Sequence, residues 1–196
     1  MKTVLHVGCG RDRIAKVRPA FKDWREVRID VDPAAKPDVL ASMTDLAPIG
    51  SESADAVYSS HSLEHLDAHE VPLALKEFAR VLRPTGFVLI TCPDLQEVCR
   101  LVANDLLVDT AYVSPEGPVA PIDMLYGHRA SIAAGKAFMA HRCGFTATVL
   151  AGTLQAAGFA AVRVMRRPES YSLWALAARL PLAEPEAAEL ARQFLP

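Results

Sequence analysis

The sequence lacks an excess of positive charge. Its 196 residues include 21 lysines and arginines against 23 aspartates and glutamates, which gives a formal net charge of -2. A basic excess is what draws a protein to the phosphate backbone of nucleic acids. We therefore expect no nucleic-acid partner.

Long apolar runs are also absent. No stretch approaches the ~20 consecutive apolar residues that span a bilayer. Met1 and Lys2 lead directly into a short strand-like run, without the apolar core of a secretory signal. These features predict a cytoplasmic protein with no membrane partner.

Closely spaced cysteines are missing as well. The four cysteines form no CxxC pair, so they predict free thiols or small buried side chains rather than a disulfide framework. No internal repeat or low-complexity tail is present. With 51% hydrophobic residues, a chain of this length can bury one full core, which predicts a single domain over residues 1–196.

Short apolar runs alternate with helix-like patterns over the first hundred residues. Continuous apolar runs bounded by glycine, proline or aspartate are typical of buried parallel strands. We expect such strands at residues 3–7, 26–31, 37–40, 54–59 and 87–92. Helical spacing covers residues 63–82, where Pro72 can start a new helix, and Asp94 is placed to cap a helix that runs to about residue 102.

The second half of the chain predicts a different arrangement. A helix is indicated over residues 145–157, a hairpin of two strands over 159–165 and 171–178, and a last helix over 184–194. The whole pattern predicts an α/β fold with a single doubly wound, Rossmann-like sheet. We expect this sheet to be mostly parallel, with an antiparallel C-terminal hairpin strand and helices on both faces.

Residues 105–145 form an insertion between the fifth strand and the late helix. Its pattern is too irregular and its length too great for an ordinary connection. We expect a functional loop or lid over the mouth of a site.

A glycine pair and an aspartate mark the first two strand ends. Gly8 and Gly10 follow the first strand, where they let the backbone approach a ligand closely. Asp30 ends the second strand, where a carboxylate can accept hydrogen bonds from both hydroxyls of a ribose. These features alone also fit a simple turn or a dinucleotide site. The third glycine of a dinucleotide loop is missing.

Four segments, in order, carry a resemblance to a known family. They are VLHVGCG, VRIDVDP, ADAVYSSHSLEHL and EFARVLRPTGFVLITCPD. Together they resemble the class I S-adenosylmethionine-dependent methyltransferases, especially the methyltransferase type 11 group. The C-terminal hairpin resembles the same family. The segment Arg11–Trp24 departs from it, because it is short and contains Pro19, which does not favour the family's usual first helix.

The resemblance implies S-adenosylmethionine as cofactor and a set of residues around it. It implies that the glycine loop lines the methionine and ribose moieties, that Asp30 binds the ribose, and that the segments after the third and fourth strands hold the adenine and the methionine end. The implied cofactor-binding residues are Gly8, Cys9, Gly10, Asp30, Ser42, Met43, Ser59, Ser60 and His61. His6 and Ser42 stand where the family often has acidic residues.

Methyl transfer from a sulfonium needs alignment more than it needs a nucleophile, because the methyl group is already activated. If the acceptor must lose a proton, a histidine titrates in the right range. His61 is the first candidate for this base, and His128 and His141 are the second. We expect His65 and His69 to lie on a helix surface.

The pentapeptide His61 to His65 also spells the HxxEH arrangement of zinc peptidases. A catalytic zinc, however, needs a third protein ligand and a helix that presents both histidines. This segment begins where a strand is expected to end, so we expect no metal.

The 105–145 insertion carries the candidate substrate contacts. Scaffold strands present such loops to a ligand, and this one contains Tyr126, His128, Arg129, His141 and Arg142. We expect these residues to orient an acceptor, most simply a small molecule. The identity of the acceptor and the oligomeric state are not encoded in these residue types.

Two other function classes remain open. One is a catalytically silent domain that binds S-adenosylmethionine or S-adenosylhomocysteine and acts through a protein partner. The other is an NAD-binding oxidoreductase, which shares the glycine loop and the acidic strand end but requires the absent third glycine and a substrate domain.

Overall fold

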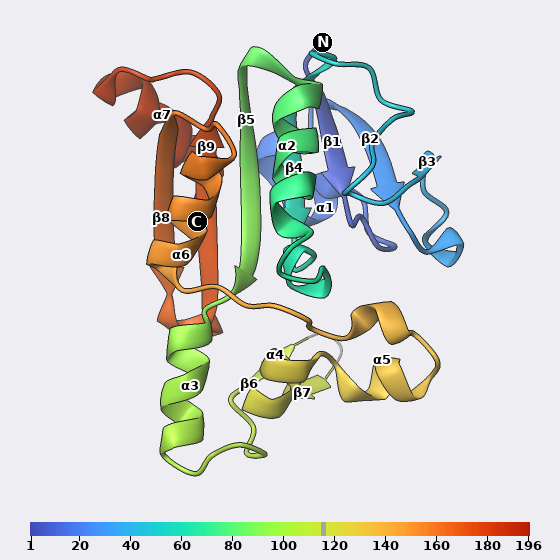
Figure 1. Cartoon of the computed structure of the whole chain (residues 1–196), viewed down its shortest axis with the longest axis vertical. Helices are drawn as coiled ribbons and strands as arrows, with labels where there is room; N and C mark the ends of the chain where they lie inside the picture. The colour runs from blue at the N-terminus through green and yellow to red at the C-terminus, as the bar shows by residue number, and fades with distance from the viewer. Residues whose placement is uncertain (115–116) are drawn as a thin grey trace.

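A seven-stranded sheet forms the centre of the protein in the computed structural model, which describes residues 1–114 and 117–196 (Figure 1). The strand order is β3-β2-β1-β4-β5-β9-β8. The strands are β1 Thr3–Val7, β2 Arg25–Asp30, β3 Val39–Leu40, β4 Ala54–Ser60, β5 Leu82–Pro93, β8 Ala161–Arg167 and β9 Ser172–Ala178. β1 to β5 pair in parallel, and β9 is antiparallel to both β5 and β8. The predicted mostly parallel sheet with an antiparallel C-terminal hairpin is confirmed.

Helices cover both faces of this sheet, as predicted. α2 (Val71–Val81) and α6 (Ala147–Ala156) pack in the core on one face, and α1 (Ile14–Val17) and α7 (Glu184–Phe194) pack in the core on the other (Figure 1). Neighbouring residues of a strand point to opposite faces. Accordingly, Val4 belongs to one core and Leu5 to the other.

The first helix is reduced to a single turn. α1 has four residues and is followed by a short 3-10 turn that begins at Pro19. Four aromatic side chains occupy the space that a longer helix would cover: Phe21, Trp24, Phe87 and Phe194. The rings of Phe21 and Phe194 have centroids 4.8 Å apart, and those of Phe87 and Phe194 are 4.7 Å apart. Burial of these rings thus replaces the apolar face of a helix.

The segment 63–82 is not one continuous helix. A 3-10 turn, Leu63–His65, is followed by extended backbone at Leu66, and α2 begins only at Val71, with Pro72 in its first turn. Proline has no N–H to donate, which suits it to a helix start. Asp94 caps α3 (Leu95–Ala103) as expected, since its side chain accepts from the Gln96 N–H.

The 105–145 segment contains more regular structure than expected. It forms the strand pair β6 (Tyr112–Ser114) and β7 (Gly117–Val119), the helices α4 (Pro121–Tyr126) and α5 (Arg129–Ala133), and a 3-10 turn at Ala137–Met139. In Figure 1 these elements lie beyond the end to which the arrow of β5 points. They are therefore placed at the carboxyl ends of the parallel strands, where α/β sheets bind ligands.

Within the described part of the chain, every helix is too short or too polar to cross a membrane.

We expect Phe194→Ala to lower the free energy of unfolding by about 3–5 kcal/mol, because it empties the centre of the aromatic cluster. Urea denaturation with linear extrapolation measures the change. Leu180→Ala is the control, since Leu180 is 48% exposed, and it should change stability by less than about 0.5 kcal/mol. A similar loss in both variants would contradict a structural role for the cluster.

Candidate functional site

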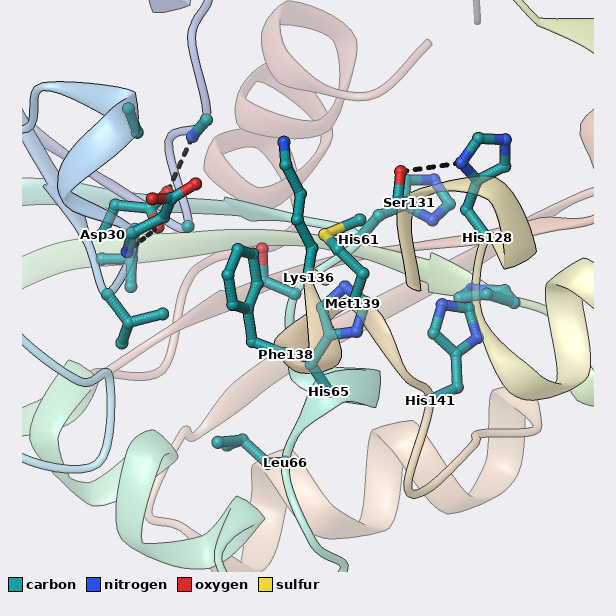
Figure 2. Close-up of a pocket in the computed structure, with 18 of the residues that line it drawn as sticks. Asp30, His61, His65, Leu66, His128, Ser131, Lys136, Phe138, Met139 and His141 are labelled. Atoms are coloured by element: carbon teal, nitrogen blue, oxygen red, sulfur yellow. Dashed lines mark hydrogen bonds between the residues drawn. The ribbon is translucent and has the colours of Figure 1, made fainter. Parts of the chain in front are cut away.

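A cavity of about 730 Å³ lies at the carboxyl edge of the sheet, between the strand ends and the 105–145 segment. This volume is in the range of small-molecule sites. Figure 2 shows Asp30 on one side of the cavity, His128, Ser131 and His141 on the other, and Lys136 and Phe138 between them. The cavity thus joins the end of β2 to the covering segment.

The loop after β1 begins with a glycine that no other residue can replace without strain. Gly8 has a φ of +68°, which L residues rarely adopt. A Cβ built on Gly8 would lie 2.1 Å from the Oγ of Ser62, in the loop after β4. Gly8 therefore lets the loops after β1 and β4 meet. Gly10 has a φ of +53°, and a Cβ built on it would enter open space.

Asp30 is held with its carboxylate at the cavity. The Gly10 N–H donates to Oδ2 at 2.8 Å, and the Asp32 N–H donates to Oδ1 at 2.9 Å. The buried Arg28 donates to the carbonyl oxygens of Gly10 and Ala35 and so braces the same loops. Because each carboxylate oxygen can accept more than one hydrogen bond, Asp30 retains acceptor capacity for two hydroxyl groups.

Six of the nine sequence-predicted cofactor residues line the cavity: Gly8, Gly10, Asp30, Ser42, Met43 and His61. The other three do not. Cys9 is buried under the loop, and burial raises the pKa of its thiol to about 11. Ser59 is fully buried, and the hydroxyl of Ser60 pairs with that of Thr91 at 2.7 Å.

His61 combines a strained backbone with a charged neighbour. Its φ is +48°, a conformation that costs a non-glycine residue about 1–3 kcal/mol. The His61 N–H donates to the Thr91 carbonyl at 2.9 Å, so pairing of β4 with β5 continues to this point. The half-exposed imidazole has its Nδ1 3.3 Å from Oε1 of Glu64. Strain of this kind concentrates at functional sites.

Glu64 is a buried carboxylate with a side chain only 1% exposed. Neither of its oxygens accepts a well-directed hydrogen bond from a described residue. Burial on its own raises the pKa of this carboxyl, but the nearby His61 and His65 outweigh it and hold the pKa below its ordinary value. A charged carboxylate thus lies behind the histidines of the cavity wall.

The expectation that His65 lies on a helix surface is wrong. The helix ends at this residue, and the chain around Ala140 packs over it, so His65 lines the cavity and its Nδ1 is 3.1 Å from the Ala140 carbonyl. Its ring lies 5.0 Å from that of His141. Burial lowers the pKa of His141. The backbone N–H of Arg142 donates to the Glu64 carbonyl at 2.8 Å, which anchors this segment. His69 is exposed as expected, but it lies in the turn before α2 and not on a helix.

The predicted substrate residues divide into two groups. His128, His141 and Arg142 line the cavity, and the Nδ1 of His128 is 2.9 Å from the Ser131 hydroxyl. Tyr126 and Arg129 do not line it: Tyr126 is 64% exposed, and Arg129 points to Asp123, with which it forms two hydrogen bonds. Arg129 therefore stabilises the covering segment itself.

Sequence reasoning missed several residues of the cavity wall. Lys136, Phe138 and Met139 come from the covering segment, and Tyr112 and Tyr171 stack with ring centroids 6.2 Å apart. Tyr171 follows the hairpin turn before β9, so no local pattern relates it to Tyr112. Lys136 could have been suspected from its position after Gly135 in the insertion.

Comparisons with known proteins agree with this geometry. Residues 5–90 match the family model of a methyltransferase domain, which spans β1 to most of β5. Over this stretch the chain is similar to methyltransferase domains. None of the curated proteins matches the sequence.

Solved structures of methyltransferases share the fold at low sequence identity. A Thermotoga maritima protein, described as a possible histamine N-methyltransferase, has a TM-score of 0.56 at 14% identity over 92% of this chain and 83% of that chain. The Burkholderia thailandensis 1,6-didemethyltoxoflavin-N1-methyltransferase, solved with S-adenosylhomocysteine, has a TM-score of 0.55 at 21% identity over 89% and 69%. A Methanosarcina mazei methyltransferase has a TM-score of 0.58 at 17% identity over 91% and 93%.

The residues that line the cavity fit S-adenosylmethionine, the methyl donor of the methyltransferases that this chain resembles. Gly10 has no atom within 4 Å of the place where a Cβ would be, which leaves room for a ligand against the loop. Asp30 offers its carboxylate at the adjacent strand end, and Ser42 and Met43 continue the same wall. The cavity therefore has an open loop and a hydroxyl acceptor side by side, as an adenosyl ligand requires.

We expect Gly8→Ala to destabilise the protein by about 2–4 kcal/mol, because the left-handed backbone and the overlap with Ser62 both oppose a methyl group. Thermal and urea unfolding measure the loss. Ser62→Gly in the Gly8→Ala background removes the overlap and should restore part of the stability. Gly50→Ala, where a Cβ meets nothing, is the control. Equal effects of the two glycine substitutions would refute the loop contact.

Proposed function

We propose that this protein binds S-adenosylmethionine in the cavity at the carboxyl edge of the sheet and transfers its methyl group to a small-molecule acceptor. The observation that carries the proposal is the Asp30 carboxylate, fixed by the Gly10 and Asp32 amides beside an open glycine loop. S-adenosylmethionine supplies an activated methyl group on a sulfonium sulfur. The chain then has to orient the two reactants and exclude water.

The two ends of the cavity suit different parts of this task. Asp30, Gly8 and Gly10 lie at the adenosyl end. His128, Lys136 and Arg142 lie at the end formed by the covering segment. These groups donate hydrogen bonds or carry positive charge, so an acceptor with an acidic or other hydrogen-bond-accepting group fits this end.

The covering segment favours a small acceptor over a macromolecule. The covering segment, from Tyr112 to Arg142, contributes 12 of the 31 residues that line the cavity. It is fixed to the backbone of Glu64 by the N–H groups of Arg142 and Cys143. A folded macromolecule would have to displace it. The two relatives named for particular substrates act on histamine, as a possibility, and on 1,6-didemethyltoxoflavin, both small nitrogen compounds.

His61 is the first candidate for a base that accepts a proton from the acceptor. It lies at the end of β4 in the cavity wall, and Glu64 sits 3.3 Å behind its Nδ1, where a carboxylate stabilises the protonated imidazole. His128 and His141 also reach the cavity and are the alternatives.

We expect calorimetric titration to show binding of S-adenosylmethionine and S-adenosylhomocysteine at micromolar concentration, and no binding of NAD. Asp30→Ala should weaken binding of both adenosyl ligands by about 10–100-fold, the equivalent of losing one or two charge-assisted hydrogen bonds. Asp23→Ala is the matched control, because Asp23 is exposed at the other end of β2. It should leave the affinities unchanged.

An acceptor screen that follows S-adenosylhomocysteine formation tests turnover. Product formation that Asp30→Ala reduces would support methyl transfer. Tight cofactor binding without product for any acceptor class would instead favour a silent binding domain that acts through a protein partner. Binding of the adenosyl ligands that Asp30→Ala leaves unchanged, or binding of NAD alone, would overturn the proposal.

A further inference from the structure

We infer that Glu64, His65 and His141 form a binding site for one divalent transition-metal ion, such as Zn²⁺, in the wall of the cavity. Each residue offers one ligand atom, and these atoms lie within 4.8 Å of one another. No other group of three or more histidine, cysteine or acidic side chains in residues 1–114 and 117–196 comes together in this way. The inference does not depend on the proposed methyl transfer.

The hydrogen bonds of the two histidines leave one ring nitrogen of each free to bind a metal. The Nδ1 atoms of His65 and His141 lie 3.1 and 2.8 Å from the carbonyl oxygens of Ala140 and Met124. A carbonyl only accepts, so each Nδ1 carries the proton and each Nε2 keeps its lone pair. Metal-binding histidines are typically oriented in this way by a second hydrogen bond to a carbonyl or carboxylate.

The carboxylate of Glu64 gives an independent reason to expect a cation. Its side chain is 1% exposed, and neither oxygen accepts a well-directed hydrogen bond from a described residue. A buried charge is costly unless it is paired or coordinates a metal. The closest partner is His61 Nδ1, 3.3 Å from Oε1. That imidazole belongs to a half-exposed side chain, so it only partly compensates the buried charge.

The ligand set matches a known chemistry. Two imidazoles and one carboxylate hold catalytic zinc with one position open, and the same set suits Fe²⁺. Ligand atoms around a tetrahedral zinc are about 3.3 Å apart at the usual bond lengths. The ligand atoms therefore need to approach one another by at most about 1.5 Å when an ion binds.

The site differs from the zinc-peptidase arrangement that the HxxEH pentapeptide suggested. His61 lies before the 3-10 turn with a left-handed backbone, so it is not one helical turn away from His65. The third ligand comes instead from His141, 76 positions further along the chain. His65 and His141 both line the cavity, so the open position of the ion is available to a ligand in it.

Titration of the full-length, chelator-treated protein with Zn²⁺ against a competing dye tests this inference. We expect one Zn²⁺ per chain, and at least about 100-fold weaker binding in Glu64→Gln and in His141→Ala, because each loses a direct ligand. His69→Ala, with an exposed histidine, and Cys143→Ser, with a thiol beside the site, are matched controls and should bind Zn²⁺ like the wild type.

Two further measurements keep the result interpretable. Zn²⁺ should raise the melting temperature of the wild type but not that of His141→Ala, and Co²⁺ should give a visible spectrum without a thiolate charge-transfer band. Absence of Zn²⁺ binding in the wild type, or binding that Glu64→Gln and His141→Ala leave unchanged, would overturn the site. S-adenosylhomocysteine titration of the same samples shows whether a variant is folded. It also separates the two proposals, since wild type that binds S-adenosylhomocysteine but no Zn²⁺ contradicts only the metal site.

Discussion

The order of the strands determines where this protein can hold a ligand. β1 lies between β2 and β4 in the sheet. After β1 the chain continues to β2 on one side, and it later returns to form β4 on the other side. The connections that follow β1 and β4 therefore lead away from each other. A crevice opens there at the carboxyl ends of the strands. Gly8 lets the two loops touch at Ser62 without closing the crevice, and Asp30 faces it from the end of β2. The proposed adenosyl end of the cavity follows from this one topological feature.

The other end of the cavity depends on the covering segment. Its return stretch is tied to the Glu64 backbone and brings His141 against His65, with ring centroids 5.0 Å apart. This packing places a buried carboxylate and several imidazoles at the end of the cavity that faces the proposed cofactor end. Such a cluster has the groups of a base, in His61 beside Glu64, and those of a metal site, in Glu64, His65 and His141.

Local sequence patterns predicted the parts of the structure that neighbouring residues determine. The period of apolar residues indicated β1, β4 and β5, and the glycine pair with Asp30 indicated one wall of the cavity. Strand ends and turns are encoded over a few residues. His65 was misplaced, since helical spacing continued past the point where the chain leaves the helix. The contacts of His141, Lys136 and Tyr171 depend on how a long insertion folds back over the sheet. Nothing in their neighbouring residues specifies that packing.

The central claim is that the cavity beside Asp30 is the adenosyl site. A crystal structure of the protein with S-adenosylhomocysteine tests it most directly. The account predicts that both ribose hydroxyls lie within hydrogen-bond distance of the Asp30 carboxylate, with the adenine toward Met43 and the sulfur toward His61. An adenosyl ligand bound elsewhere, or one whose ribose does not contact Asp30, would contradict it.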